Sequence, residues 1–248
     1  HYYFIYPMLG LTLVVPCYNE ANRLPLGQYT HFLSHSDGVK LLFVNDGSSD
    51  NTATELQKLQ KQFPEKIEVL DLKQNLGKAE AVREGVHHLI SSQTEKIGYL
   101  DADLSTSLEE CVSLAQQVDP SIPFVFGSRI LKIDNRIERK WYRFLIGRIL
   151  ATVISKMLRI KVYDTQCGCK IFTHGTAQSL FQERFLSKWL FDVELFFRMI
   201  ALVGRPQLSQ KVKEIPLQSW IDTEDSRVQF SYAFVLWLDL IKIYRHYR

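Results

Sequence analysis

The chain has 248 residues, of which 46% are hydrophobic and 23% are charged, a composition typical of a folded, soluble protein. Its formal net charge of +3 is too small to indicate a nucleic-acid-binding protein, so we expect no nucleic-acid partner. Its cysteines, which include Cys167 and Cys169, lack the spacing of a disulfide framework or a zinc site, so we expect a reducing, cytosolic setting.

The first half of the chain alternates between apolar runs and helical patterns. Four runs predict buried strands, at 11–15, 40–44, 67–72 and 97–100. The helical patterns that follow them end near Ser36, Gln62, Ile90 and Val118. Pro16 lacks the amide hydrogen that a strand ladder uses, so we expect it to end the first strand. This alternation predicts a single α/β domain in which helices flank a mostly parallel central sheet.

Polar residues follow each predicted strand. Tyr18 and Glu20 follow the first strand, Asp46 the second, Lys78 the third, and Asp101 and Asp103 the fourth. The carboxyl ends of parallel strands meet at one edge of a sheet, where open α/β sheets bind their ligands, so we expect a binding site there. The sequence contains neither a Walker loop nor a G-x-G-x-x-G fingerprint, which argues against P-loop NTPases and dinucleotide oxidoreductases.

Asp101 and Asp103 stand one residue apart at the end of the fourth predicted strand. Two carboxylates held so close repel each other unless a cation lies between them. Oxygen ligands of this kind suit Mg²⁺ or Mn²⁺, which keep open positions for the oxygens of a diphosphate. The alternative is that both aspartates are solvated and cap the helix predicted over 105–118.

Positive charge is concentrated in the segment 129–161, where ten Lys or Arg residues stand against two acidic residues, a local balance of +8. Within 140–160, apolar residues recur at helical spacing, with Arg143, Arg148, Lys156 and Arg159 mostly between them. Such a basic amphipathic helix can lie in a membrane interface, where cations meet anionic headgroups. Alternatively it packs on the sheet or on a partner chain. We expect no transmembrane helix, because the apolar runs at both ends of the chain are interrupted too early, and no signal peptide.

Five short motifs stand in order along the chain. They are Val15-Pro16-Cys17-Tyr18-Asn19-Glu20, Asn45-Asp46-Gly47-Ser48, Asn75-Leu76-Gly77-Lys78, Asp101-Ala102-Asp103 and Gly127-Ser128-Arg129. Together they resemble the motif series of family 2 glycosyltransferases with the GT-A fold, a Rossmann-like α/β fold. Further motifs are Asp164-Thr165-Gln166-Cys167-Gly168-Cys169-Lys170-Ile171-Phe172, Phe191-Asp192-Val193-Glu194-Leu195, and Glu214-Ile215-Pro216 with Trp220. These resemble one branch, the dolichyl-phosphate (polyprenyl-phosphate) β-glucosyltransferases, and the resemblance extends over about 11–244.

The resemblance implies one GT-A domain over 1–248, with a nucleotide-sugar half at about 9–128 and an acceptor half at about 129–248. It implies that the nucleotide is bound by Pro16, Tyr18, Glu20, Asn45, Asp46, Lys78, Asp101 and Asp103. Asp101 and Asp103 would hold Mg²⁺ or Mn²⁺ and the diphosphate. The chain departs from the family pattern at Asn45, where Asp is usual, and at Asp225-Ser226-Arg227, where Gly-Ser-Lys is usual. Arg for Lys keeps the charge but not the geometry.

Charge considerations separate the possible acceptors. A hydroxyl acceptor needs a general base, whereas a phosphate, with a second pKa of about 6, arrives as a ready nucleophile and needs cations to hold it. For the phosphate we predict Arg129, Lys170 and Arg227 as ligands. Asp103 would act through its metal, as a Lewis acid. Asp164 is a candidate base or orienting residue, and Asp192 and Glu194 are alternatives for that role.

We therefore expect a metal-dependent, inverting glycosyltransferase that moves glucose from UDP-glucose to a polyprenyl phosphate. We expect it to work peripherally at the cytoplasmic face of a membrane, with the helix at 140–160 on the membrane surface. Within the same enzyme class, the alternatives are mannosyl transfer from GDP-mannose and transfer to a saccharide hydroxyl. A catalytically silent nucleotide-sugar binding protein is the alternative from a different class.

Overall fold

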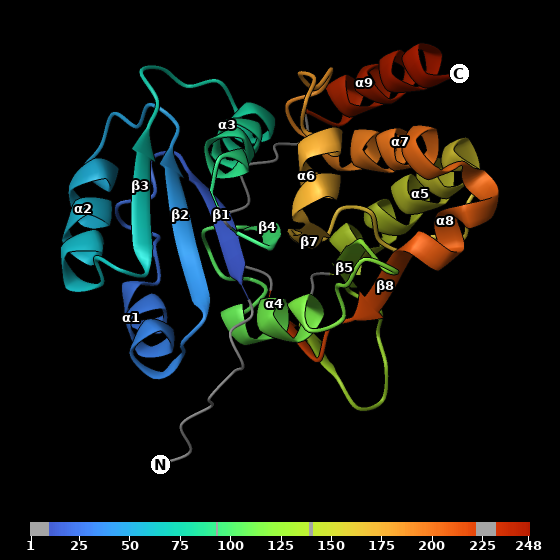
Figure 1. Ribbon diagram of the computed structural model, residues 1–248. Helices are drawn as coiled ribbons and strands as arrows, with labels where there is room; N and C mark the ends of the chain where they lie inside the picture. Colours follow the sequence, from blue (N-terminus) through green and yellow to red (C-terminus); the bar gives the residue numbers. More distant parts are fainter. Residues whose placement is uncertain (1–9, 93, 139–140, 222–231) are drawn as a thin grey trace.

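The computed structural model describes residues 10–92, 94–138, 141–221 and 232–248 (Figure 1). Within these ranges, the side chains of residues 138, 141–146 and 232–234 are not described. No helix in the described parts has both the length and the apolarity needed to cross a membrane.

A mostly parallel sheet forms the centre of the domain. Its strands are β1 (Leu11–Cys17), β2 (Val39–Asn45), β3 (Ile67–Asp71), β4 (Lys96–Leu100), β5 (Phe124–Ser128), β7 (Cys169–Thr173) and β8 (Val212–Pro216). Their order is β3-β2-β1-β4-β7-β5-β8, with β7 antiparallel to both of its neighbours and every other pair parallel. Two short strands, β6 (Arg136–Glu138) and β9 (Ser219–Ile221), form a separate parallel pair.

Helices cover both faces of the sheet (Figure 1). They are α1 (Leu26–His35), α2 (Thr52–Gln62), α3 (Lys78–Ile90), α4 (Leu108–Ala115), α5 (Trp141–Leu158), α6 (His174–Leu180), α7 (Phe191–Val203), α8 (Arg205–Lys211) and α9 (Tyr232–Tyr247). Helices α1, α2 and α4 share the core on one face, and α3 and α5 to α9 share the core on the other. The predicted α/β fold, with helices flanking a mostly parallel sheet, is confirmed.

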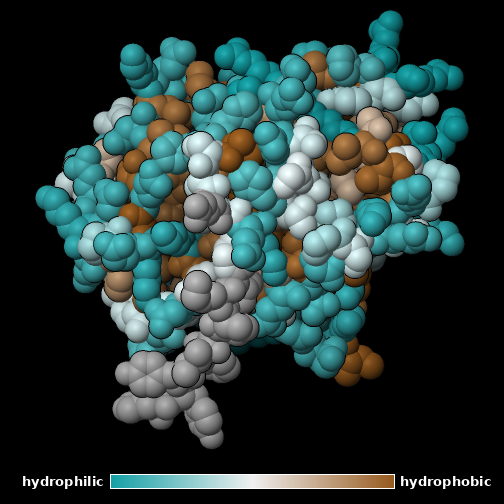
Figure 2. Space-filling model, viewed as in Figure 1, coloured by the Kyte–Doolittle hydropathy of each residue, from teal (hydrophilic) through white to brown (hydrophobic). Residues whose placement is uncertain are grey.

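Both faces of the central strands are buried, which explains why these strands appear in the sequence as continuous apolar runs. In β1, Leu13 and Val15 contribute to the core beside α1, α2 and α4, whereas Val14 contributes to the opposite core, as expected from the period of two in a strand. The opposite core is rich in aromatic rings, and the ring centroids of Phe124 and Phe172 lie 4.5 Å apart. Figure 2 shows that hydrophilic residues cover most of one outer face, with smaller hydrophobic areas between them.

Two predicted boundaries were wrong. Pro16 does not end β1 but lies within it, opposite Val44 of β2. The pairing of β1 with β4 stops at Val14 and Tyr99, so Pro16 has no neighbour on the β4 side and its missing amide hydrogen costs no ladder bond there. The helix expected over 105–118 is the shorter α4, because the Ser107 side chain caps it by accepting a hydrogen bond from the Glu110 amide at 3.2 Å.

Helix α5 occupies the position of the predicted basic helix. Its residues Ile154 and Leu158 are fully buried in the core that α7 also lines. This contact corresponds to the interpretation in which the helix packs on its own domain. Ile149 on the same helix is 54% exposed, so α5 also presents an apolar side chain outward.

Candidate functional site

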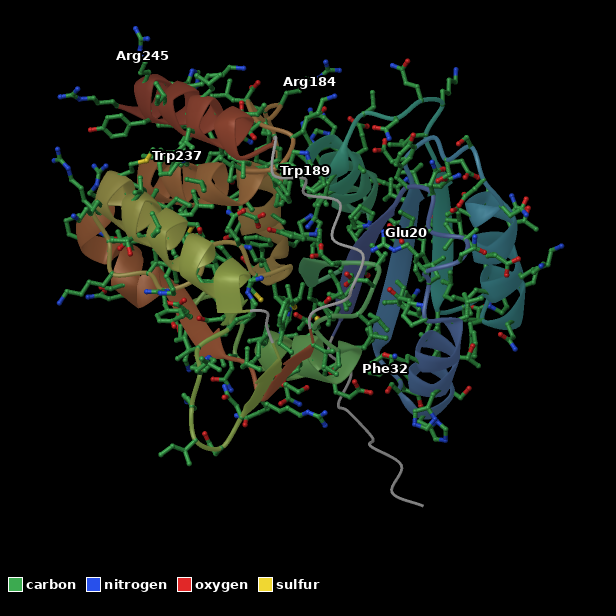
Figure 3. The ribbon with its side chains drawn as sticks, turned by 180° about the vertical axis from the view of Figure 1, so that it is seen from behind. Glu20, Phe32, Arg184, Trp189, Trp237 and Arg245 are labelled. Carbon is green, nitrogen blue, oxygen red and sulfur yellow. The ribbon has the colours of Figure 1, made fainter. Side chains whose placement is uncertain are left out.

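The carboxyl edge of the sheet collects the predicted nucleotide-binding residues. Cys17 at the end of β1 lies opposite Asn45 at the end of β2, so the loops that follow these parallel strands emerge side by side. Glu20 lies in the loop after β1 (Figure 3), and its amide donates to the Thr52 hydroxyl at 2.7 Å. The first loop is thereby tied to the start of α2. Tyr18 and Pro16 are partly exposed next to it.

Asp46 and Asn45 organise two neighbouring loops. The Asp46 carboxylate is almost fully buried and accepts hydrogen bonds from the amides of Leu76 and Gly77, at 2.7 and 2.8 Å. These bonds hold the loop that leads into α3. The Asn45 side-chain amide donates to Asp71 Oδ1 at 2.7 Å. An aspartate at position 45 would place a second carboxylate against Asp71, which gives a physical reason for the departure from the family pattern.

Lys78 and Asp101 form an ion pair across the edge of the sheet. Lys78 Nζ lies 2.5 Å from Asp101 Oδ1, and both side chains are partly exposed. Burial acts to lower the pKa of Lys78, but the charges of Asp101 and Asp192 outweigh it, so this pKa is raised. On its other side, Asp101 packs against Gly168, where an added Cβ would lie 2.2 Å from Asp101 Oδ2. Only a glycine leaves room for this carboxylate.

The donor set around Asp103 suits a hard metal only in part. Asp103 Oδ1 accepts a hydrogen bond from the Ser105 amide at 3.0 Å, which fixes the turn after β4. No cluster of three or more metal-binding side chains is found in the described parts of the chain. Asp101 and Asp103 supply oxygen atoms of the kind that Mg²⁺ and Mn²⁺ prefer. These residues therefore fit a metal that takes most of its ligands from a bound diphosphate.

Arg129 and Asp164 form a second, better-buried ion pair. Arg129 Nε and Nη2 donate to the two oxygens of Asp164, at 2.6 and 2.8 Å, in the bidentate geometry that a guanidinium favours. Burial acts to raise the pKa of Asp164, but the charge and hydrogen bonds of Arg129 outweigh it and lower this pKa to about 2. Trp220 lies beside the pair, with its ring centroid 5.2 Å from the Arg129 guanidinium carbon.

Two residues hold the segment that carries Asp164: Glu214, which had no predicted role, and Arg148, which was expected among the membrane-facing cations of the basic helix. Glu214 of β8 accepts hydrogen bonds from the amides of Tyr163 and Asp164, the latter at 2.8 Å. Arg148 of α5 donates to the Tyr163 carbonyl at 2.9 Å, and its guanidinium lies 3.7 Å from the centroid of the Tyr163 ring. Glu214 belongs to one of the motifs that carry the family resemblance. The sequence nevertheless does not show that it contacts Asp164, because the two residues are 50 positions apart.

The remaining candidates lie deeper. Lys170 is fully buried, and its ammonium group donates to Asp192 at 2.5 Å and to the Cys167 carbonyl at 2.7 Å. Tyr99 also donates to Asp192. Glu194 accepts hydrogen bonds from the amides of Leu186 and Ser187, and burial raises its pKa. In this structure Asp192 and Glu194 are thus committed to internal contacts. Arg227, the last predicted acceptor ligand, lies outside the described residues.

Comparisons with known proteins agree with the motif series. Residues 12–181 match the model of the family described as glycosyl transferase family 2. The chain is 30% identical to a dolichyl-phosphate beta-glucosyltransferase of Trichomonas vaginalis, with 98% of this chain and 75% of the relative covered. It is 31% identical to a human protein of the same name, with 77% and 63% covered. The corresponding values for the protein of that name from Saccharomyces cerevisiae are 28% identity, with 88% and 69% covered.

Solved structures show the same fold at low sequence identity. Glucosyl-3-phosphoglycerate synthase of Mycobacterium tuberculosis, solved in complex with UDP, is similar with a TM-score of 0.68 at 15% identity, over 96% of this chain and 79% of that one. A mannosyltransferase of Pyrobaculum calidifontis, solved with GDP-Man and Mn²⁺, is similar with a TM-score of 0.62 at 16% identity, over 98% and 66%. The GT-A fold expected from the sequence is therefore confirmed.

Proposed function

The chain belongs to glycosyl transferase family 2, and from this premise we propose that it transfers glucose from UDP-glucose to a polyprenyl phosphate with inversion. Its relatives are named for dolichyl phosphate as acceptor and for a β-glucosyl product, which supports both the lipid phosphate and the sugar. The chain is a hexosyltransferase by family. The observation that carries the choice of acceptor is the buried pair of Arg129 and Asp164.

Asp164 is a poor general base in this arrangement. A base works best when its pKa is near the working pH, whereas Arg129 lowers the pKa of Asp164 to about 2. A hydroxyl acceptor would need a better base, but a phosphate with a second pKa of about 6 needs none. We assign Asp164 the role of orienting Arg129. In the described parts of the chain, Arg129 Nη1 makes no hydrogen bond, so this edge of the guanidinium is available to phosphate oxygens.

The reaction then needs one displacement at the anomeric carbon. An oxygen of the acceptor phosphate forms a bond to this carbon, while the bond from the carbon to the β-phosphate oxygen of UDP-glucose breaks and UDP leaves. Attack on the side opposite the leaving group inverts the configuration. We assign Lys78 to the phosphates of the donor and the loops around Asp46 and Tyr18 to its nucleoside. Mg²⁺ or Mn²⁺ on Asp101 and Asp103 would stabilise the charge of the leaving diphosphate.

The other predicted acceptor ligands are assigned less direct roles. Lys170 is enclosed between Asp192 and Cys167, so we propose that it positions the segment around Cys167 beneath the site and does not contact the acceptor phosphate. The carboxylate of Asp192, which pairs with it, cancels most of its positive charge. Arg227 remains a proposed phosphate ligand on sequence grounds.

We also propose that the protein works peripherally at the cytoplasmic face of a membrane, because its lipid acceptor resides there. On α5, Lys156 is exposed and Ile149 is 54% exposed, and Arg159, directly after the helix, is also exposed. On α9, Leu238 and Ile241 are 52% and 54% exposed, near a basic end where Arg245 extends away from the domain (Figure 3). Exposed apolar side chains flanked by cations favour an anionic lipid surface.

Donor and acceptor panels test the reaction. Calorimetric titration with UDP-glucose and with GDP-mannose, each with Mn²⁺, should show tighter binding of UDP-glucose; tighter GDP-mannose binding would contradict the glucosyl assignment. Labelled donor should give product with a short-chain polyprenyl phosphate and not with saccharide acceptors. Absence of product with every acceptor would leave a nucleotide-sugar binding protein.

Liposome flotation tests the membrane surface. Joint substitution Lys156→Gln, Arg159→Gln, Leu238→Ser and Ile241→Ser should reduce binding to vesicles that contain an anionic phospholipid. A charge-matched control, Lys40→Gln with Lys61→Gln, changes exposed lysines at the amino end of β2 and on α2 and should bind normally. Equal binding of all variants would contradict the assigned surface.

A further inference from the structure

Three polar atoms beside the pair of Arg129 and Asp164 are buried and have no hydrogen-bond partner among the described residues. They are Ser128 Oγ, Thr165 Oγ1 and Gln166 Nε2. Ser128 and Thr165 are 0% and 2% exposed. Most buried polar groups in folded proteins are paired, so an unpaired one calls for a partner that the described part of the chain does not supply. Each of the three residues adjoins Arg129 or lies within two positions of Asp164, so the missing partners belong to one locality.

This locality lies between the two ends of the proposed reaction. The segment from Asp164 to Gly168 begins at the residue that holds Arg129 and ends at the glycine that packs against Asp101. Along this segment, Thr165 and Gln166 therefore come between the residue that contacts the proposed acceptor cation and the residue that contacts the proposed diphosphate site. In a direct displacement the transferred sugar must lie between the leaving diphosphate and the incoming nucleophile.

We infer that Ser128, Thr165 and Gln166 form the subsite for the transferred hexose and read its hydroxyl groups. This inference rests on the proposed function and specifies which residues select the sugar. A sugar hydroxyl both donates and accepts hydrogen bonds, as do the Ser128 and Thr165 hydroxyls, and the Gln166 amide supplies donors and an acceptor. A phosphate only accepts. Neutral groups of mixed character therefore match a hexose better than a second phosphate.

The chemistry also predicts why discrimination is strong at such a site. A sugar that lacks a hydroxyl, or carries it in the other configuration, leaves a buried polar group of the protein unpaired, and this penalty is what rejects close analogues. The alternative is that ordered water molecules form hydrogen bonds with all three atoms and that the sugar binds elsewhere.

The test compares binding of a nucleotide sugar with binding of its nucleoside diphosphate. The variants are Thr165→Val and Gln166→Met, which remove the polar group and keep the volume approximately. Because neither group has a partner in the described parts of the protein, we expect the melting temperature to stay unchanged or to rise. We expect UDP to bind with unchanged affinity by calorimetry. Turnover of UDP-glucose should fall about tenfold or more, and the preference for UDP-glucose over UDP-galactose should shrink.

Thr176→Val is the matched control, because Thr176 is also a buried threonine but its hydroxyl pairs with Thr173 at 3.0 Å. It should leave donor selectivity unchanged. The inference is wrong if the variants lose UDP and UDP-glucose affinity equally, or if selectivity does not change. A lower melting temperature with normal kinetics would show that water was the partner, and would also overturn it. If wild-type protein instead uses GDP-mannose, the proposed donor fails separately, and the same comparison is made with GDP and GDP-mannose.

Discussion

Gly168 lies so close to Asp101 that a Cβ at position 168 would stand 2.2 Å from Asp101 Oδ2. The contact joins the residue before β7 to the residue after β4, and so places the segment that follows Asp164 against the proposed diphosphate site. It also makes the position of the Asp101 carboxylate depend on the absence of one methyl group.

The first prediction is that Gly168→Ala weakens donor binding. The added methyl must push Asp101 aside and lengthen its 2.5 Å pair with Lys78, so the Michaelis constant for UDP-glucose should rise about tenfold or more. Gly175→Ala is the control, because a Cβ there meets nothing within 4 Å; it should leave kinetics unchanged. Normal donor kinetics in Gly168→Ala would show that the position of Asp101 does not matter.

The second prediction concerns the metal. Asp103→Ala should remove most turnover, because the proposed Lewis acid loses a ligand, while the domain stays folded, since Asp103 is only partly buried. Activity is measured over a titration of Mn²⁺, and folding by circular dichroism. Near wild-type, metal-dependent turnover would contradict the ligand assignment, as would full activity of the wild-type protein in excess chelator.

The third prediction is that a change at the cation Arg129 lowers the rate of transfer more than a change at the candidate base Asp164. Arg129→Lys should lower transfer to polyprenyl phosphate about a hundredfold, because lysine keeps the charge but loses the bidentate fork. Hydrolysis of the donor by water should be less affected. Asp164→Asn should lower the rate of transfer by less than the hundredfold or more that is expected when a true general base is removed. The opposite ranking would favour a hydroxyl acceptor.

The fourth prediction uses the pH dependence of stability. The pKa of Asp164 is lowered to about 2 in the folded state, below its unfolded value of about 3.9. Its pair with Arg129 therefore contributes stability that is fully present above about pH 5 and is lost as the pH falls toward 2, by about 2 kcal/mol in total. In urea titrations, the stability difference between wild type and Asp164→Asn should shrink over this range. A constant difference would refute the ionised pair.

The fifth prediction assigns a positioning role to Glu214. Glu214→Gln keeps the shape but weakens the hold on the amides of Tyr163 and Asp164, so the Michaelis constant for the lipid acceptor should rise several-fold while that for UDP-glucose stays constant. Asp119→Asn is the control, because this carboxylate also accepts two backbone amides, from Ser121 and Ile122, before the amino end of β5. If Glu214 had only a structural role, Glu214→Gln would lower the stability of the protein and leave the Michaelis constants for the lipid acceptor and for UDP-glucose unchanged.

The sequence predicted well which residues gather at the sheet edge, but it did not predict the hydrogen bonds and ion pairs among them. The apolar runs and the polar residues after them are local features, so the edge that gathers Asp46, Lys78 and Asp101 followed from spacing alone. The roles within it depend on contacts between distant residues. Asp46 turns out to hold the Leu76 and Gly77 amides, and nothing near Asp46 in the sequence indicates that.

Lys170 shows a second limit of sequence reasoning. Lysine is rarely fully buried without a partner, so a basic residue in a motif is naturally interpreted as a surface ligand. Here Asp192, 22 positions away, accepts from its ammonium group at 2.5 Å. The pairing depends on the position of β7, which lies between β4 and β5 and runs antiparallel to both. The pattern of apolar residues in the sequence does not reveal this strand order or direction.

The same strand order ties the two predicted halves of the chain, at about 9–128 and about 129–248, into one folded unit. β7 comes from the acceptor half, yet it pairs with β4 and β5, both from the nucleotide half. Excising the acceptor half would remove β7 and β8, so β5 would lose both of its neighbours and β4 would lose one. The halves therefore cannot be exchanged between proteins like modules on a linker. Acceptor preference is instead more readily altered by substitutions in the loops, such as the loop between β5 and β6, because these substitutions leave the shared sheet intact.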